Sequence, residues 1–266
     1  MSRKRQDATR PEEEILVRSL ALRLPDGFRI DSHEHAWAQM IYATRGVMSV
    51  FAAAGSWVVP SRRALWMPAG FSHRVEMSGS VAMRTLYFRP DATTGLPRRC
   101  RVLGVSPLLR ELVLEILRIG HLYSTQPSHA RLAAVLFDQL RGTPEVALDL
   151  RLPEDPRALR LARRVFADPG SPCGLSALAR DIGASPRTLE RLFQKELGTT
   201  FGRWRKRVRL HHALRLLARG SSVTTAAREV GYGSTSAFIA TFKRALGKTP
   251  RRYYLDGPPA GIRYDK

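Results

Sequence analysis

The sequence has few cysteines, few acidic residues and no long apolar runs. Among its 266 residues, Cys100 and Cys173 are the two cysteines, too few for a disulfide framework or a paired zinc motif. No apolar run reaches the length of about 18 residues that a membrane span needs, and the charged N-terminus lacks the apolar core of a signal peptide. We therefore expect a cytoplasmic protein with no membrane partner.

The shortage of acidic residues is greatest in the second half of the chain. Lys and Arg number 44 against 23 Asp and Glu, which gives a net charge of +21 at pH 7. Residues 1–155 contain 21 basic and 16 acidic side chains, whereas residues 156–266 contain 23 and 7. Such a polycation favours a polyanionic partner such as double-stranded DNA.

Short apolar runs, separated by Gly and Pro about every eight to twelve residues, fill residues 29–89. This pattern is typical of a β-barrel or a β-sandwich. Two amphipathic helices are expected after it, at 107–122 and 129–140. The apolar stripe of the first helix either covers the barrel or meets its copy in a second subunit, and its width favours a homodimer.

A helix-turn-helix is predicted in residues 226–253. A short helix ends at Gly231, and Ser234 is expected to cap a second helix whose apolar face contains Phe238, Phe242 and Leu246. In DNA-binding proteins with this order of elements, the second helix enters the major groove.

The same pattern occurs earlier in the chain, displaced by about 48 residues before the turn and about 49 after it. Gly183 corresponds to Gly231, and the residues after the turn correspond pairwise: Ser185 to Ser234, Leu189 to Phe238, Phe193 to Phe242 and Gly198 to Gly247. Residues 202–220, between the copies, are expected to form a rigid linker helix. Two helix-turn-helix units joined in this way, here called the first and second readers, can reach successive turns of the same DNA groove, about 34 Å apart.

The second copy resembles the signature of AraC/XylS-type transcription regulators. The resemblance covers about residues 156–255 and is carried by Gly231-Tyr232, Ser236-Ala237-Phe238, Phe242-Lys243-Arg244, Gly247, Thr249-Pro250 and Tyr253. It implies seven helices, of which the third and sixth are recognition helices. It places the base-reading positions on Arg187, Glu190 and Arg191 in the first reader and on Thr235, Ser236 and Ala240 in the second.

The two sets of base-reading residues differ in chemistry. Arg can donate two hydrogen bonds to guanine and Glu can accept one from cytosine, each good pair contributing about 1–3 kcal/mol of discrimination. We therefore expect Arg187 and Arg191 to discriminate bases and the second reader mainly to position the protein. An alternative is that Glu190, Arg191 and Lys195 form a solvated, salt-bridged face. Phosphate contacts are expected from Ser185, Lys195, Arg203, Arg205, Lys243, Arg244 and Arg251.

A histidine constellation in the first half resembles the two motifs of cupin barrels. It contains His33-Glu34-His35, Gln39 and Gly46, then Pro68-Ala69-Gly70 and His73, with Gln39 where the first motif usually has Glu. His33 and His35 are expected on one face of a strand, with His73 brought beside them by the Pro-Gly turn. The three imidazoles and Gln39 could hold a divalent transition metal, shape an effector pocket without catalysis, or be buried histidines satisfied by hydrogen bonds.

The expected fold is therefore a multidomain α+β chain: a cupin-like β-barrel, a helical connector and an all-α tandem helix-turn-helix domain. The expected boundaries are a flexible arm (1–14), a sensing domain (15–97), a helical connector and dimerisation region (98–141), a linker (142–155), the DNA-binding domain (156–256) and a tail (257–266).

Three functions remain open at this point. A transcription regulator that senses a small effector and reads a promoter, with RNA polymerase as a further partner, accounts for every motif. A metal-dependent cupin enzyme with a DNA-binding tail depends on metal at the histidines, and an architectural protein without sequence preference depends on charge alone. We expect the regulator, without catalysis; the effector, the operator and the choice between activator and repressor are not readable from the sequence.

Overall fold

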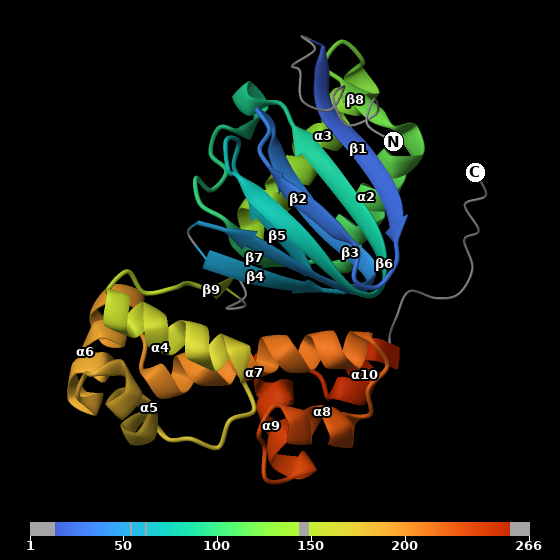
Figure 1. The fold of residues 1–266 in the computed structure, drawn as a ribbon. Helices are drawn as coiled ribbons and strands as arrows, with labels where there is room; N and C mark the ends of the chain where they lie inside the picture. The colour runs from blue at the N-terminus through green and yellow to red at the C-terminus, as the bar shows by residue number, and fades with distance from the viewer. Residues whose placement is uncertain (1–13, 54, 62, 144–148, 256–266) are drawn as a thin grey trace. The chain divides into compact units, whose positions relative to one another are not determined.

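The computed structural model describes residues 14–53, 55–61, 63–143 and 149–255 (Figure 1). The chain divides into two compact units, Met1–Arg151 and Leu152–Lys266. The division falls inside the segment 142–155 that was expected to be a linker. The expected tail and all of the expected arm except Glu14 lie outside the described residues.

The first unit contains a nine-stranded antiparallel sheet built around two long strands, β3 and β6. The N-terminal part of β3 pairs with β5 and its C-terminal part with β4, while β6 pairs with β2 and then with β1. The strands are β1 (Ile15–Leu24), β2 (Arg29–His33), β3 (Ala38–Ala52), β4 (Gly55–Pro60), β5 (Arg63–Met67), β6 (His73–Phe88), β7 (Arg101–Gly104), β8 (His121–Tyr123) and β9 (Asp149–Leu150). The expected all-β region is present, and it begins earlier than residue 29, with β1.

A local irregularity allows β3 and β6 to run together over most of their length. Their register shifts between Ala43 and Val47, where Gly46 has a φ of 76°. A Cβ atom at Gly46 would lie 2.7 Å from Val81 Cγ2 and 2.8 Å from the Ser80 carbonyl oxygen. Glycine is therefore required at position 46 both by the backbone conformation and by the close approach of β6.

Two helices, α2 (Pro107–Ile119) and α3 (Pro127–Gly142), cover one face of this sheet (Figure 1). The shared core contains residues from the sheet and from both helices: Val17, Met40, Trp66, Phe88, Leu109, Val113, Ile116, Leu136 and Phe137. The apolar stripe of α2, which favoured a homodimer, is thus buried within its own unit. Its helix also ends earlier than expected, because Gly120 stops it with a φ of 96° and Leu122 belongs to β8.

The expected helical connector, 98–141, is consequently an integral part of the sheet unit. It contributes two strands, β7 and β8, in addition to α2 and α3. β7 extends the sheet beside β5, and β8 extends it beside β1.

The second unit contains seven helices among its described residues, as the resemblance implied. They are α4 (Pro156–Ala167), α5 (Leu175–Ile182), α6 (Pro186–Leu197), α7 (Phe201–Ala218), α8 (Val223–Glu229), α9 (Thr235–Leu246) and α10 (Pro250–Leu255). The pairs α5–α6 and α8–α9 are the two copies of the repeat, and α7 links them. No helix in the described part is long and apolar enough to cross a membrane.

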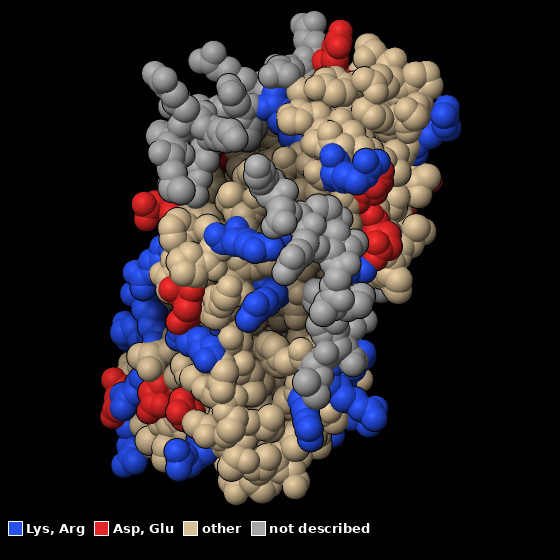
Figure 2. All heavy atoms as spheres, turned by 90° about the vertical axis from the view of Figure 1, so that its right-hand side faces the viewer, with Lys and Arg blue, Asp and Glu red and all other residues tan. Residues whose placement is uncertain are grey.

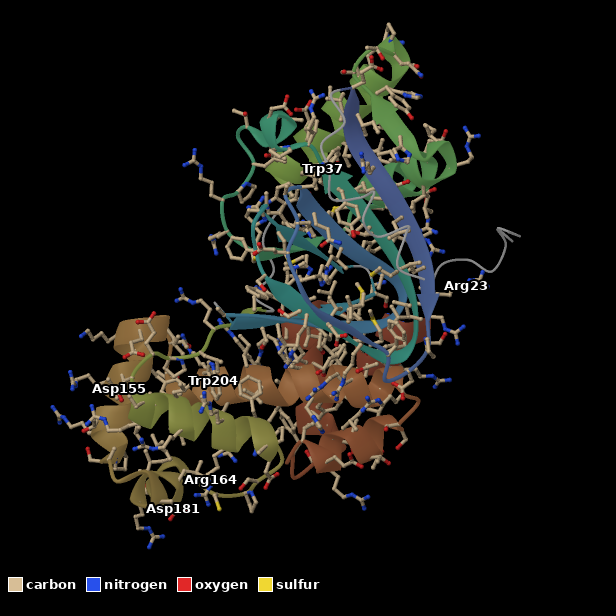
Figure 3. The ribbon with its side chains drawn as sticks, turned by 45° about the horizontal axis from the view of Figure 1, so that its top comes forward. Arg23, Trp37, Asp155, Arg164, Asp181 and Trp204 are labelled. Carbon is tan, nitrogen blue, oxygen red and sulfur yellow. The ribbon has the colours of Figure 1, made fainter. Side chains whose placement is uncertain are left out.

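Each copy of the repeat has its own aromatic core. Trp204 of α7 lies 5.5 Å from Phe166 and 5.3 Å from Phe193, measured between ring centroids, and Figure 3 shows it inside the helical unit. In the second copy, Phe238 and Phe242 are 5.7 Å apart, and Tyr253 of α10 lies 5.7 Å from Phe242. Edge-to-face contacts of this kind stabilise a specific packing in addition to burying apolar area.

Replacing Gly46 by Ala should destabilise the sheet unit, because the added methyl group meets both Val81 and a backbone oxygen at a positive φ. We expect a loss of at least about 2 kcal/mol in the free energy of unfolding. Gly27→Ala is the control, since Gly27 has a φ of 75° with no atom within 4 Å of the position its methyl group would take, and should cost about 1 kcal/mol. Urea unfolding of the full chain measures both; equal losses would contradict the close-approach argument.

Candidate DNA-binding surface and histidine cluster

The first helix-turn-helix consists of α5 and α6. Gly183 ends α5 in the left-handed conformation, with a φ of 71°, and the Ser185 hydroxyl caps α6 by accepting a hydrogen bond from the Thr188 amide. One face of α6 is buried in the unit by Leu189, Leu192 and Phe193. The opposite face is left in contact with solvent.

The exposed face of α6 presents a row of basic side chains. Arg187, Arg191 and Lys195 are all exposed and follow one another at intervals of four residues, about one helical turn. Within the described part of the chain, neither arginine forms a hydrogen bond or an ion pair, and no ion pair joins Arg191 or Lys195 to Glu190. Both guanidinium groups are therefore available to a ligand in solution.

Glu190 has a different environment from its neighbours on α6. Its side chain is half-buried, and Oε2 accepts a hydrogen bond of 3.1 Å from the Phe201 amide, at the start of α7. A carboxylate in this position satisfies one of the free amides of the helix N-terminus. The structure thus gives Glu190 a helix-capping role, whereas the resemblance placed it among the base readers.

The second helix-turn-helix repeats this frame with different exposed groups. Gly231 has a φ of 76°, and the Ser234 hydroxyl caps α9 by accepting a hydrogen bond from the Ala237 amide. Of the expected base-reading positions, Ser236 and Ala240 are exposed and Thr235 is half-buried. These small side chains contain no group that can form the bidentate contact of an arginine.

Most of the expected phosphate-binding residues are exposed, namely Lys195, Arg203, Lys243, Arg244 and Arg251. Figure 2 shows the excess of Lys and Arg over Asp and Glu on one face of the molecule. Ser185 is also exposed, but its hydroxyl oxygen already caps α6.

Arg205 differs from the other expected phosphate contacts because its guanidinium is already hydrogen-bonded within the helical unit, and its phosphate contact stays a prediction. Its guanidinium donates hydrogen bonds to the backbone oxygens of Ser171 and Cys173, in the loop between α4 and α5. Burial, with a further contribution from the neighbouring Arg209, lowers the pKa of Arg205. The sequence period placed this residue on α7 correctly but did not reveal that the loop carbonyls lie against it.

The three histidines of the cupin-like motifs converge in the sheet unit. Their ring centroids are 4.3 Å apart for His33 and His73, 5.4 Å for His35 and His73, and 6.1 Å for His33 and His35. One nitrogen from each ring lies within 4.8 Å of the others. His73 is 1% exposed and His35 is 6% exposed, whereas His33 is half-buried.

The three histidines are brought together by a different arrangement of the chain from the one that the sequence predicted. His33 ends β2 and pairs with His73 at the start of β6, but His35 lies beyond the strand and shares no strand face with His33. The turn before β6 holds His35 in place, since the Gly70 amide donates a hydrogen bond of 3.0 Å to the His35 carbonyl.

The backbone fixes the tautomers of these rings. Nδ1 of His33 faces the Asp31 carbonyl at 2.8 Å, Nδ1 of His73 faces the Phe71 carbonyl at 2.9 Å, and Nδ1 of His35 faces the Trp37 carbonyl. Because a carbonyl only accepts hydrogen bonds, each Nδ1 carries the proton and each neutral ring keeps a lone pair on Nε2. Burial lowers the pKa of His35, and burial with the adjacent His33 and His35 lowers the pKa of His73 to about 4.

Two Nε2 atoms show that this cluster suits a cation. Nε2 of His73 is buried without a hydrogen-bond partner in the described structure, and Nε2 of His35 lies 2.9 Å from Gln39 Oε1. Two acceptors face each other there, because the Gln39 nitrogen is directed to Thr85 Oγ1. Three imidazole nitrogens and an amide oxygen form a donor set that fits a divalent first-row metal.

Several residues around the cluster carried no recognisable sequence motif. Thr85 accepts a hydrogen bond of 2.9 Å from Gln39 Nε2, and the ring of Tyr87 lies edge-on to His35 at 5.3 Å. Arg18, 5% exposed, has its guanidinium 4.7 Å from the ring centroid of Trp37. The strand alternation of β6, which places positions 85 and 87 on one face, is the signal that could have identified the first two.

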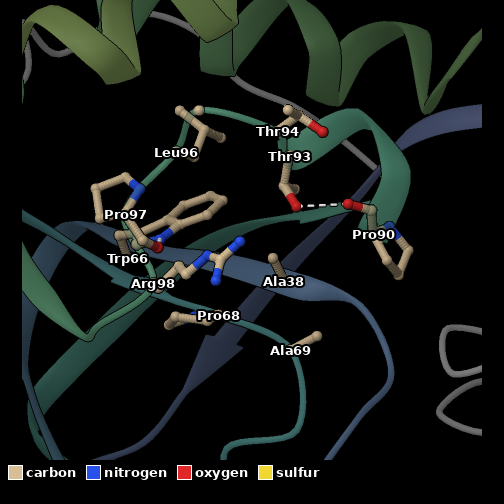
Figure 4. Close-up of a pocket in the computed structure, with 11 residues that line it drawn as sticks. Ala38, Trp66, Pro68, Ala69, Pro90, Thr93, Thr94, Leu96, Pro97 and Arg98 are labelled. Carbon is tan, nitrogen blue, oxygen red and sulfur yellow. Dashed lines mark hydrogen bonds between the residues drawn. The ribbon is translucent and has the colours of Figure 1, made fainter.

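A separate pocket of about 270 Å³ opens between the end of β5 and the segment that follows β6 (Figure 4). Trp66 and Arg98 are among the residues that line it, and the Trp66 indole donates a hydrogen bond of 2.8 Å to the Pro97 carbonyl. None of the three histidines lines this pocket. Trp66 is only 2% exposed, so its ring offers little surface to a ligand.

Two descriptions of protein families match the chain. One, "AraC-like ligand binding domain", matches residues 20–168, and the other, "Helix-turn-helix domain", matches residues 178–254. The chain belongs to the AraC family of transcription regulators. The first match begins within β1 and includes the rest of the sheet, α2, α3 and α4, and the second includes both recognition helices.

One relative that is similar over most of the chain agrees with this AraC-family assignment, and two solved structures are similar to the chain as well. The chain is 34% identical over 221 residues to the HTH-type transcriptional regulator NimR of Escherichia coli, covering 83% of this chain and 81% of NimR. A crystal structure of an AraC-type DNA-binding domain protein from Chromobacterium violaceum is 27% identical over 40% of this chain and 96% of its own, with a TM-score of 0.37. A structure of ToxT from Vibrio cholerae with a bound fatty acid is 12% identical over 96% of this chain and 99% of its own, with a TM-score of 0.39.

Replacing Glu190 by Ala should destabilise the helical unit of this regulator by about 1 kcal/mol, because the Phe201 amide loses its capping partner. Arg191→Ala, on the exposed face of the same helix, is the control and should change stability by less than about 0.5 kcal/mol. Urea unfolding of the full chain measures both variants. If Glu190→Ala leaves stability unchanged and instead alters preference at one base pair, the capping role is refuted.

Proposed function

We propose that this AraC-family regulator binds its operator with two unequal heads, the first being the helix-turn-helix of α5 and α6 and the second that of α8 and α9. Base discrimination lies in Arg187 and Arg191 of α6, while α9 mainly positions the protein on the DNA. The observation that carries the proposal is the contrast between the two exposed faces: two unengaged guanidinium groups on α6, against Ser236 and Ala240 on α9. Arg187 and Arg191 are one turn apart, which lets both reach base edges in the same groove.

The remaining exposed basic residues supply affinity without sequence preference. Lys195, Arg203, Lys243, Arg244 and Arg251 suit contacts with phosphates, and Ser185 keeps a phosphate contact as a proposal alongside its capping role. Each phosphate neutralised releases counterions, so binding should weaken steeply as salt rises. Such contacts fix the register of the protein on the duplex, and the arginines of α6 then select the bases.

Fluorescence anisotropy on duplex DNA from upstream of the chain's own gene tests this division. Arg187→Ala and Arg191→Ala should each weaken binding to the preferred site by about 5- to 150-fold, the equivalent of 1–3 kcal/mol, with little change on random DNA. Thr235→Ala and Ser236→Ala are the controls and should change the preference for that site less than about threefold, because each removes only a small side-chain group.

Two outcomes would contradict the proposal. If the unmodified chain binds the upstream DNA no better than random DNA at physiological salt, it is an architectural protein. If substitutions at Thr235 or Ser236 change base preference more than Arg187→Ala does, the roles of the two heads are reversed.

We also propose that the small effector binds at the histidine cluster, with His33, His35, Gln39 and His73 shaping its site. The buried, unpartnered Nε2 of His73 supports this, because such an atom is poised to bond a ligand. A divalent transition metal is the second candidate occupant, favoured by the donor set already described. If metal binds, the imidazoles would hold it and its positive charge would attract an anionic effector.

The substitution Gln39→Glu tests whether the histidine cluster binds a divalent metal or a small effector without metal. A carboxylate in place of the amide should raise the affinity for Zn²⁺ by at least about tenfold, because it adds a negative charge to the donor set. Chelator competition measures the affinity, and His73→Ala is the control that should abolish binding. If the purified chain contains no stoichiometric metal and Gln39→Glu binds Zn²⁺ no more tightly, the metal and the alternative of a metal-dependent enzyme are both removed.

A homodimer, contact with RNA polymerase and a cytoplasmic location remain proposals. The buried stripe of α2 no longer supports the dimer, but Leu108 of α2 and Val135 of α3 are 52% and 43% exposed. Light scattering of the full chain tests the subunit number, and a monomer at every concentration would contradict the dimer. A promoter-binding regulator works beside the polymerase and the DNA, which supports the other two.

A further inference from the structure

The two halves of the DNA-binding unit meet at a contact that neither copy of the repeat contains by itself. The loop between α4 and α5 lies directly against the turn between α8 and α9. A Cβ atom at Gly170 would lie 2.3 Å from the Glu229 carbonyl oxygen, and one at Gly231 would lie 2.4 Å from the Gly170 carbonyl oxygen. Backbones this close leave no room for a side chain between them, so both positions require glycine.

One arginine spans this contact. Arg209 of α7 donates three hydrogen bonds to backbone oxygens: from Nε to Pro169 at 3.0 Å, from Nη2 to Ser171 at 3.0 Å and from Nη1 to Gly231 at 3.1 Å. Two of the acceptors belong to the loop that leads into the first helix-turn-helix, and the third belongs to the turn of the second. The ring of Tyr232 lies 5.9 Å from the guanidinium carbon.

The arrangement uses features that are particular to arginine. A guanidinium is planar and has five N–H donors in fixed directions, so it can hold three carbonyls at set distances. A lysine would retain the charge but would offer its donors from a single nitrogen on a flexible chain. Arg205, one turn earlier, bonds only the loop and does not reach the second copy.

We propose that Arg209 is a positioning residue for DNA recognition. It fixes the turn of the second helix-turn-helix against the loop of the first, and so sets the distance and angle between the recognition helices α6 and α9. The proposal rests on tandem reading by these two helices, as proposed above. Its consequence is that Arg209 determines whether both heads can bind one duplex together, and does not itself contact DNA.

The reason is thermodynamic. When two heads are held in the geometry of the operator, the second binds as an intramolecular event at high effective concentration. If the contact loosens, each head keeps its own affinity but the second must lose orientational freedom on binding. The advantage of a two-half-site operator over a single half-site should therefore fall, whereas binding to one half-site should not.

Two variants loosen the contact in independent ways. Arg209→Lys keeps the charge but removes the three-carbonyl clamp. Gly170→Ala leaves every charge in place and pushes the loop away from the Glu229 carbonyl. Their controls are Lys206→Met, which removes an exposed charge from α7, and Gly174→Ala, in the same loop but with nothing within 4 Å of the added methyl group.

The experiment is anisotropy with the full chain on duplexes that carry two half-sites or one, over a range of salt concentrations. Arg209→Lys and Gly170→Ala should each reduce affinity for the two-half-site duplex by about 10- to 100-fold, a partial loss of the roughly 10²- to 10⁴-fold advantage that linked sites can have. Affinity for a single half-site should change less than about twofold, with an unchanged salt slope, because no phosphate contact is lost. Both controls should retain the two-site advantage, although Lys206→Met can lower overall affinity.

Other outcomes overturn the proposal. If Arg209→Lys and Gly170→Ala keep the two-site advantage of the unmodified chain, Arg209 does not set the geometry. If Arg209→Lys weakens one and two half-sites equally, the residue serves general stability or binds DNA, and the salt slope and urea transition tell which. If the unmodified chain itself shows no two-site advantage, tandem reading is refuted, and the positioning role of Arg209 is refuted with it.

Discussion

The close backbone contact between Gly170 and Gly231, bridged by Arg209, is the constraint on which the helical unit depends. Each copy of the repeat packs on its own aromatic core. The loop before the first helix-turn-helix contacts the turn of the second, and one residue of the linker helix bonds both segments; this is the contact that we propose makes the two copies act as one reader. The length of α7 alone would not fix the angle between α6 and α9.

The two copies share a frame and differ in their chemistry. Ser185 and Ser234 cap the recognition helices, and Gly198 and Gly247 end them in the left-handed conformation. The outward faces differ most, with Arg187 and Arg191 on α6 where the equivalent positions of α9 have Ser236 and Ala240. Because the frame is held by caps and apolar residues, the exposed positions are free to differ without changing the fold. This separation of frame and surface is what the proposed division of roles requires, in which one head discriminates bases and the other positions the protein.

Features governed by local rules were predictable from the sequence. Ser234 as a helix cap and Gly231 as a turn follow from short-range patterns, whereas the approach of His33, His35 and His73 was expected from the resemblance to cupin motifs and is reached by a different arrangement. Features that depend on contacts between distant segments were not: the Phe201 amide facing Glu190, the loop carbonyls facing Arg205 and Arg209, and the sheet that buries the α2 stripe. An amphipathic pattern shows that one face of a helix is buried, but it does not show which segment covers that face. In the same way, the position of an arginine or a glutamate in the sequence does not show which distant backbone group it will bond.

The central claim is that base discrimination lies in α6. Selection from a random duplex library with the full chain, followed by sequencing, tests it most directly. We expect two half-sites centred about 10 base pairs apart, one strongly constrained and containing guanine, the other weakly constrained. A double Arg187→Ala and Arg191→Ala variant should lose the constraint at the strong half-site and retain the weak one. The account is contradicted if the strong half-site survives in that variant and is lost instead when Thr235 and Ser236 are replaced by Ala.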